Sequence, residues 1–119
     1  MVAKTHNMTL MRGDTARIGV SIKGLTGTPD ALTFSVKRYK TDTEYIIHKT
    51  LDSGIEPKTV QTGLRYVVTI DPADTEELAA AGYCYDLEAV INGDVITLLT
   101  GDIQLAADVT RHTGEEAGV

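Results

Sequence analysis

A regular alternation of apolar and polar residues is the feature that most constrains the fold of this chain. In "YCYDLEAVI", residues 83–91, every second residue from Tyr83 to Ile91 is apolar, and Asp86 and Glu88 lie between them. Successive side chains point to opposite faces of a strand, so this segment can bury one face and expose the other. Similar patterns over residues 15–23, 32–40, 64–70 and 102–109 predict an all-β domain.

Shorter segments at 7–11, 44–51 and 94–100 bring the expected number of strands to about eight. Asn92-Gly93 predicts a tight hairpin, whereas residues 53–63 are interpreted as a loop that crosses between sheets. We therefore expect two antiparallel sheets packed face to face as a β-sandwich. The predicted core consists of the apolar sides of the longer strands: Leu32, Phe34, Val36, Tyr66, Val68, Ile70, Tyr85, Leu87, Ile103 and Leu105.

One segment, "DPADTEELAAAG", has the features of a helix. Asp71 is a good N-cap, Pro72 suits the first helical position, and acidic residues favour the first turn. Gly82 is expected to end this helix, which we predict over about residues 72–81.

Length and charge restrict the organisation and the partners. The 119 residues predict a single domain over 7–110, with flexible tails at 1–6 and 111–119. The net charge of −6 argues against nucleic-acid binding, and the single Cys84 rules out an intramolecular disulfide. The sequence contains no apolar run long enough to cross a bilayer and no signal-peptide core at its N-terminus. We therefore expect no membrane partner and synthesis in the cytosol.

The tripeptide Arg12-Gly13-Asp14 has two readings. As a cell-adhesion sequence it would need an exposed loop on a protein that reaches a cell surface, which nothing else in the sequence supports. The favoured interpretation is a structural turn over Arg12, Gly13, Asp14 and Thr15, because Gly adopts backbone angles that other residues avoid and Asp bonds nearby amides.

No group of residues predicts catalysis, a cofactor or a metal. His6, His48 and His112 are far apart in the sequence, and no nucleophile motif surrounds any serine. Cys84 lies between two tyrosines in a predicted strand, where we expect a buried, inert thiol. The expectation is a protein that is not an enzyme and binds no cofactor.

Several motifs, taken in order, carry a family resemblance: "RGDT", "LTFSVK", "YVVTIDPADTEEL", "YCYDLEAV" and "NGDVITLLTGDIQLAADVT". Over residues 8–110 the chain resembles the immunoglobulin-like domains of tailed-phage structural proteins, and it is most similar to the N-terminal domain of phage baseplate upper proteins. The resemblance implies an immunoglobulin-like sandwich that serves as a structural or assembly module of a phage or prophage tail or baseplate. It implies protein partners and a location in the virion, or in the bacterial cytoplasm when expressed from a prophage. The alternative is a carbohydrate- or surface-recognition module.

Two further expectations concern single residues. In antibody-type domains an acidic turn precedes a strand whose tyrosine bonds back to the backbone, so Tyr83 or Tyr85 is expected to form such a tyrosine corner. The equal alternative is a core aromatic with its hydroxyl at the rim.

The segment 44–51 is apolar on both sides, as an interface strand would be. We expect Tyr45, Ile46, Ile47 and Leu51 to form an interface with a second copy or a tail protein.

Overall fold

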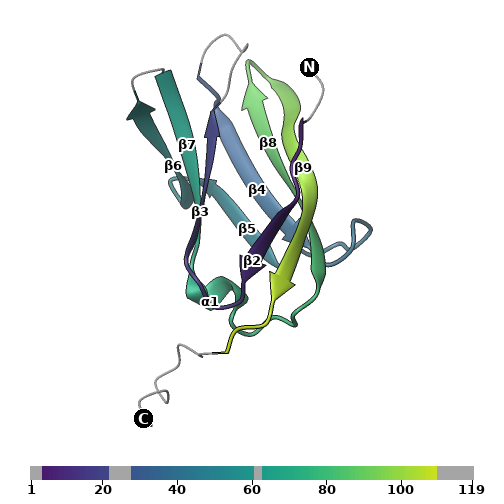
Figure 1. Ribbon diagram of the computed structural model, residues 1–119. Coiled ribbons are helices and arrows are strands. Elements are labelled where there is room, and N and C mark those ends of the chain that lie inside the picture. Colours follow the sequence, from purple (N-terminus) through teal and green to yellow (C-terminus); the bar gives the residue numbers. More distant parts are fainter. Residues whose placement is uncertain (1–3, 22–27, 61–62, 110–119) are drawn as a thin grey trace.

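The computed structural model describes residues 4–21, 28–60 and 63–109, which form nine strands and one helical turn (Figure 1). The elements are β1 (Lys4–Thr5), β2 (Met8–Met11), β3 (Ala16–Ser21), β4 (Ala31–Lys37), β5 (Ile47–Leu51), β6 (Gly54–Val60), β7 (Gly63–Ile70), α1 (Pro72–Thr75), β8 (Gly82–Ile91) and β9 (Asp94–Ala106).

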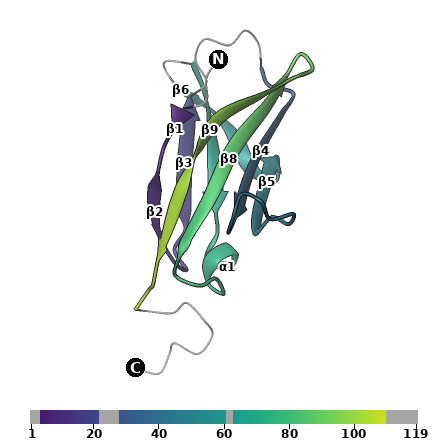
Figure 2. The same cartoon turned by 90° about the vertical axis from the view of Figure 1, so that its right-hand side faces the viewer.

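The strands form one sheet that curls into two layers (Figures 1 and 2). Their order is β1-β9-β8-β4-β5-β6-β7-β3, and β2 also pairs with β9. One layer contains β1, β2, β9, β8, β4 and β5, and the other contains β6, β7 and β3. The layers are continuous where β5 and β6 pair in parallel at Thr50–Gly54 and Leu51–Ile55. The predicted β-sandwich is confirmed, with the difference that β1 and β2 also run parallel to β9.

The core lies between the two layers. Every residue predicted for it is at most 3% exposed, and the Phe34 and Tyr85 rings pack with their centroids 5.5 Å apart. The alternation in β8 is complete, because each of its inward side chains is buried and each outward one is half-buried. Val20, Ile47, Ile55, Tyr83, Ala89 and Ile91 complete the core.

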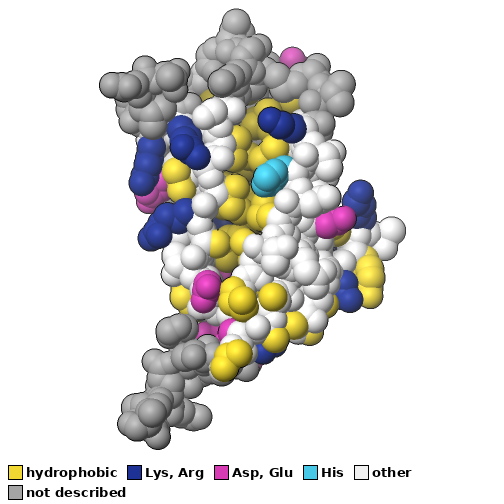
Figure 3. All heavy atoms as spheres, in the orientation of Figure 1, with side chains coloured by type: hydrophobic (Ala, Val, Ile, Leu, Met, Phe, Trp, Pro, Cys, Tyr) yellow, Lys and Arg dark blue, Asp and Glu magenta, His cyan; other side chains and the backbone are white. Residues whose placement is uncertain are grey.

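The side of the sandwich between β2 and β3 is closed by side chains, since β2 pairs with β9 and β3 pairs with β7. Met8 and Leu10 of β2 and Ile18 of β3 are half-buried there and pack against the core. Hydrophobic side chains accordingly remain visible down the middle of Figure 3, which has the orientation of Figure 1.

The expected loop over residues 53–63 is wrong, because residues 54–60 form strand β6 and pair with β7. Ile55 explains the difference, since its side chain is 0% exposed and belongs to the core. Pro57 makes this strand difficult to predict from the sequence, because proline cannot donate a backbone hydrogen bond to a neighbouring strand and favours edge positions.

The expected helix over 72–81 is also wrong in length, because α1 ends at Thr75. Asp71 and Asp74 form the capping box at its start. After one turn the chain is held by tertiary contacts. The Leu78 carbonyl accepts a hydrogen bond from Arg12, and the Ala79 carbonyl accepts one from Tyr83. Of these two partners Arg12 is distant in the sequence and Tyr83 is four residues away, and Gly82 begins β8 instead of ending a helix.

The predicted hairpin at Asn92-Gly93 is confirmed, with φ values of 53° and 85°. Its second strand, expected as two strands over 94–100 and 102–109, is the single strand β9. β9 contains a bulge at Leu98, because Leu87 of β8 faces Leu99 whereas Glu88 faces Thr97. The bulge shifts the register, so the two expected strands belong to one continuous strand.

The N-terminal boundary differs from the expected tail over 1–6. Lys4 and Thr5 pair with β9, and the His6 amide donates to the Thr100 carbonyl at 2.9 Å. Gly101 allows this close approach, because a Cβ atom there would clash with the His6 carbonyl. Residues 1–3 and the expected tail at 111–119 lie outside the described residues.

Candidate functional site

The turn at Arg12 to Thr15 is anchored in the fold. Arg12 Nε donates to Asp108 Oδ1 at 2.8 Å, and both side chains are largely buried, at 19% and 7% exposed. Gly13 has a φ of 82°, and its amide donates to Thr75 Oγ1 at 2.8 Å. Asp14 and Thr15 are exposed. The guanidinium is thus occupied by internal partners, and the turn connects β2 in one layer to β3 in the other.

The two predicted tyrosines have different partners. The Tyr83 hydroxyl donates to the Ala79 carbonyl at 2.8 Å, four residues earlier in the chain, which is the geometry of a tyrosine corner. The Tyr85 hydroxyl instead donates to the His6 carbonyl at 2.5 Å and so holds the segment between β1 and β2. Burial raises the pKa of the Tyr85 hydroxyl.

The four residues of the expected interface do not lie on one surface. Tyr45 and Ile46 are 53% and 37% exposed, whereas Ile47 is 6% exposed and Leu51 packs against the core. The reason is the register of β5, which starts at Ile47 opposite Val36 and turns alternate residues inward. Tyr45 and Ile46 alone remain available to a partner.

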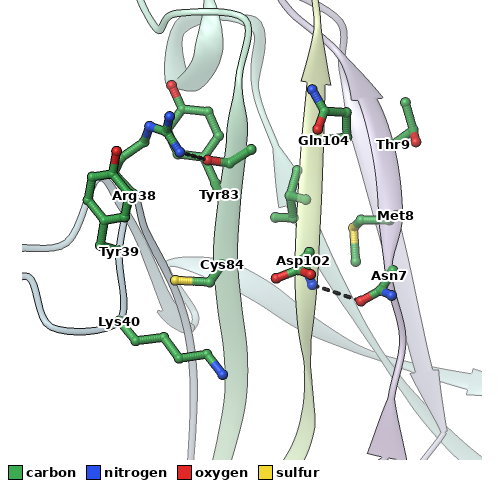
Figure 4. A pocket seen from close by; sticks show the side chains of 12 residues that line it. Asn7, Met8, Thr9, Arg38, Tyr39, Lys40, Tyr83, Cys84, Asp102 and Gln104 are labelled. Carbon is green, nitrogen blue, oxygen red and sulfur yellow. Dashed lines mark hydrogen bonds between the residues drawn. The ribbon is translucent and has the colours of Figure 1, made fainter.

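The solvent-facing side of β9, β8, β4 and β5, called here the outer face, carries the polar side chains of these strands. It contains two neighbouring hollows. Figure 4 shows the first, where the end of β4 approaches β8 and β9. Arg38 lies between two aromatic rings there, with its guanidinium carbon 4.8 Å from the Tyr39 centroid and 5.4 Å from that of Tyr83. It also donates to the Gly82 carbonyl, so it is fixed in place.

Tyr45 lines the second hollow and stacks on His48. The Tyr45 and His48 rings lie 4.7 Å apart, and Lys37 Nζ lies 5.2 Å from the Tyr45 centroid. Asp86 lines the same hollow. Burial raises the pKa of its carboxyl, and the charge of Lys37 opposes this shift.

One contact on the outer face resembles part of a catalytic group. Ser35 Oγ and His48 Nδ1 are 3.2 Å apart, but a serine nucleophile needs a base that a third group orients. In the described part of the chain no carboxylate hydrogen-bonds to His48. Within the same residues, no three His, Cys, Asp or Glu side chains are grouped to hold a metal ion. Cys84, expected to be buried, is half-exposed on this face because it alternates with the inward Tyr83 and Tyr85.

Sequence reasoning did not identify the outer face as a site. Its polar residues follow the ordinary pattern of a solvated strand face, so no motif marks them. The described residues also contain no helix long and apolar enough to span a membrane.

No protein-family model matches this sequence, and no curated protein is significantly similar to it. Solved structures do resemble it. The BTLA ectodomain matches with a TM-score of 0.51 at 9% identity, over 91% of this chain and 95% of that chain. The extracellular domain of the voltage-gated sodium channel beta4 subunit, described in parallel homodimers, has a TM-score of 0.43 at 13% identity, over 92% and 97%. An extracellular fragment of novel immune-type receptor 11 from Ictalurus punctatus has a TM-score of 0.42 at 13% identity, over 100% and 94%. The first match shows that the chain has an immunoglobulin-like β-sandwich fold.

Proposed function

We propose that this chain is a non-catalytic protein-interaction module that binds its partner through the outer face. The observation that carries this proposal is the pairing of exposed aromatic rings with cations at the end of β4 and in the segment that joins it to β5, beside the hydrogen-bonded sheet. Tyr39 and Tyr45 are 58% and 53% exposed, and Arg38 and Lys37 lie over their rings. Tyrosine and arginine are enriched in the parts of protein interfaces that contribute most to affinity.

The rigidity of this surface supports the same conclusion. Arg38 contacts three other groups and Tyr45 contacts two, so these side chains are ordered before a partner arrives. A surface that is already ordered loses less side-chain entropy on association than a flexible one.

The partners we propose are proteins of a phage or prophage tail or baseplate-like assembly, with the chain in the virion or in the bacterial cytoplasm when expressed from a prophage. This part of the proposal rests on the order of sequence motifs over residues 8–110. The immunoglobulin-like fold is compatible with it and is shared with extracellular receptor domains.

The alternative function is carbohydrate or surface recognition, which the exposed tyrosines favour. Sugar rings stack on an open aromatic face. Tyr45 has His48 against its ring and Lys37 nearby, and Tyr39 has Arg38 over its ring. These contacts make protein recognition the better-supported function, and binding of the purified chain to a glycan array would favour the alternative.

Site-specific photocrosslinking tests the proposal. A photoreactive phenylalanine derivative replaces Tyr45 on the outer face or, as a control, Lys58 on β6 in the other layer. In cells that produce the protein naturally, we expect discrete protein adducts from position 45 and none from position 58. Equal labelling at both positions, or no protein adduct at position 45, would contradict the proposal. Identification of the crosslinked proteins tests whether they belong to a phage tail or baseplate-like assembly.

A further inference from the structure

We infer that the outer face binds the outer face of a second copy of this chain, in a symmetric dimer whose two-fold axis runs parallel to the strands. The inference rests on the proposed function and names its partner. It comes from the way charge is divided between the strands of this face.

The outer face has a basic half and an acidic half. Lys37 of β4 and Lys40, which follows it, line the basic half. The outward residues of β8 and β9 include Asp86, Glu88 and Asp102. Within the described part of the chain, none of these five side chains takes part in the close ion pairs, which join Arg12 to Asp108 and Lys49 to Asp71 and Asp74. Lys37 and Asp86 nevertheless attract each other within one chain, so charges on another molecule compete with this interaction.

The strand register places these charges in rows. Thr33 of β4 lies beside Glu88 of β8, and the next outward pair along the strands is Ser35 beside Asp86. Each row thus carries a neutral side chain on β4 and a carboxylate on β8. A copy that exchanges the positions of β4 and β8 would lay Glu88 over the half-buried Thr33, whose hydroxyl can donate a hydrogen bond to it. Ser35 is buried and contacts His48 within its own chain, so Asp86 would instead face the nearby Lys37 of the second copy.

Two orientations of a two-fold axis in the plane of the interface can bring two such faces together. The positions of the charges decide between these orientations. An axis perpendicular to the strands would lay β8 over β8 of the second copy and so bring acidic strand against acidic strand. An axis parallel to the strands, on the line between β4 and β8, lays β4 over β8 of the partner and keeps the rows aligned. Lys37 and Lys40 then lie over the half that holds Asp86 and Asp102. Like charges facing each other are unfavourable in an interface, so the parallel axis is favoured.

The size of the face predicts the strength of the dimer. Four strands about 4.8 Å apart and about eight residues long, at about 3.3 Å per residue, cover roughly 500 Å² per copy. The total of about 1,000 Å² is at the lower end of specific interfaces, where complexes are weak and transient. We therefore expect dissociation in the micromolar range that weakens as added salt screens the charges.

Charge reversal tests whether these charges hold the two copies together. One double variant, Lys37→Glu with Lys40→Glu, makes the outer face acidic, and another, Glu88→Lys with Asp102→Lys, makes it basic. In sedimentation velocity experiments the wild type should dimerise with concentration, and each variant alone should associate at least about tenfold more weakly. An equimolar mixture of the two variants should recover association at least as tight as that of the wild type, because each reversed pair of charges then faces the other reversed pair and each unchanged pair faces its complement.

The matched control reverses two charges on the other layer, Glu56→Lys with Lys58→Glu on β6, and should change the dimerisation constant less than about twofold. Circular dichroism confirms that each variant is folded. A wild type that stays monomeric at about 1 mM, or folded variants that fail to associate when mixed, would overturn the inference. If photocrosslinking at Tyr45 then still captured other proteins, the proposed function would stand without the dimer.

Discussion

The hydrogen bond between the Gly13 amide and the Thr75 hydroxyl offers a sharp test of how the turn at residues 12–15 is stabilised. Thr75 is 3% exposed, and its Oγ1 accepts from the amide at 2.8 Å. In Thr75→Val a methyl group replaces the hydroxyl with little change in shape. The Gly13 N–H then stays buried without this acceptor, which costs about 1–3 kcal/mol.

Thr75→Ser is the matched comparison, because it keeps the acceptor and removes the methyl group. The loss of one buried methyl costs about 1 kcal/mol. We therefore expect the valine variant to lose about 2 kcal/mol and the serine variant about half as much, although valine fills the site better. Burial alone predicts the opposite order.

Urea unfolding followed by circular dichroism measures the difference. With a denaturant slope of about 2 kcal/mol per molar, the midpoint should fall by about 1 M for Thr75→Val and about 0.5 M for Thr75→Ser, with unchanged slopes. A valine variant as stable as the serine variant would show that packing, and not the hydrogen bond, fixes the turn to α1.

Four further outcomes are expected from the same unfolding assay. Phe34→Ala should lose about 3–5 kcal/mol, because its ring is 1% exposed in the core, and a loss below about 1 kcal/mol would contradict that role. Tyr83→Phe should lose about 1 kcal/mol with the bond to the Ala79 carbonyl, and an unchanged midpoint would show that the bond contributes nothing. Gly13→Ala should lose about 1–2 kcal/mol from its φ of 82° alone, because the nearest atom to an added Cβ is 3.7 Å away, and a much larger loss would indicate a clash. Burial raises the pKa of Asp86 in the folded state, so the folded state binds its proton more tightly and the free energy of unfolding falls as pH rises from the unfolded to the folded pKa. As the pH rises from about 3 to about 7, the Asp86→Asn variant should therefore gain stability relative to the wild type. A difference in free energy of unfolding that stays constant with pH would contradict the raised pKa.

Strand β6 and helix α1 show where the local sequence pattern is insufficient to predict secondary structure. Ile55 is the one buried residue among 54–58, and this stretch contains a proline, so its sequence shows no alternation typical of a strand. Pairing with β7 makes it a strand. The segment after Thr75 has good helix formers, but the Leu78 amide bonds to the Thr75 carbonyl, three residues earlier, and not to that of Asp74. The chain is then tied to Arg12 through the Leu78 carbonyl and to Leu105 of β9 through the Ala81 carbonyl. In both cases a distant partner outweighs a local preference.

The outer face illustrates the same limit for function. Lys37 and Glu88 are 51 positions apart by their residue numbers, and only the register of β4 with β8 places basic and acidic halves side by side. A polar residue on a solvated strand face has no local signature, because water satisfies it equally well in any register.

The sequence by itself determined the all-β class, the core and the hairpin at Asn92-Gly93. These features depend on local chemistry: the two-residue period of a strand and the backbone angles that Asn and Gly tolerate. Only the tertiary structure decided that Arg12 pairs with Asp108, that Tyr83 and Tyr85 bond to different carbonyls, and which residues of 45–51 reach solvent. Contacts between residues far apart in the chain depend on how the layers pack, and periodicity within one segment carries no information about that packing.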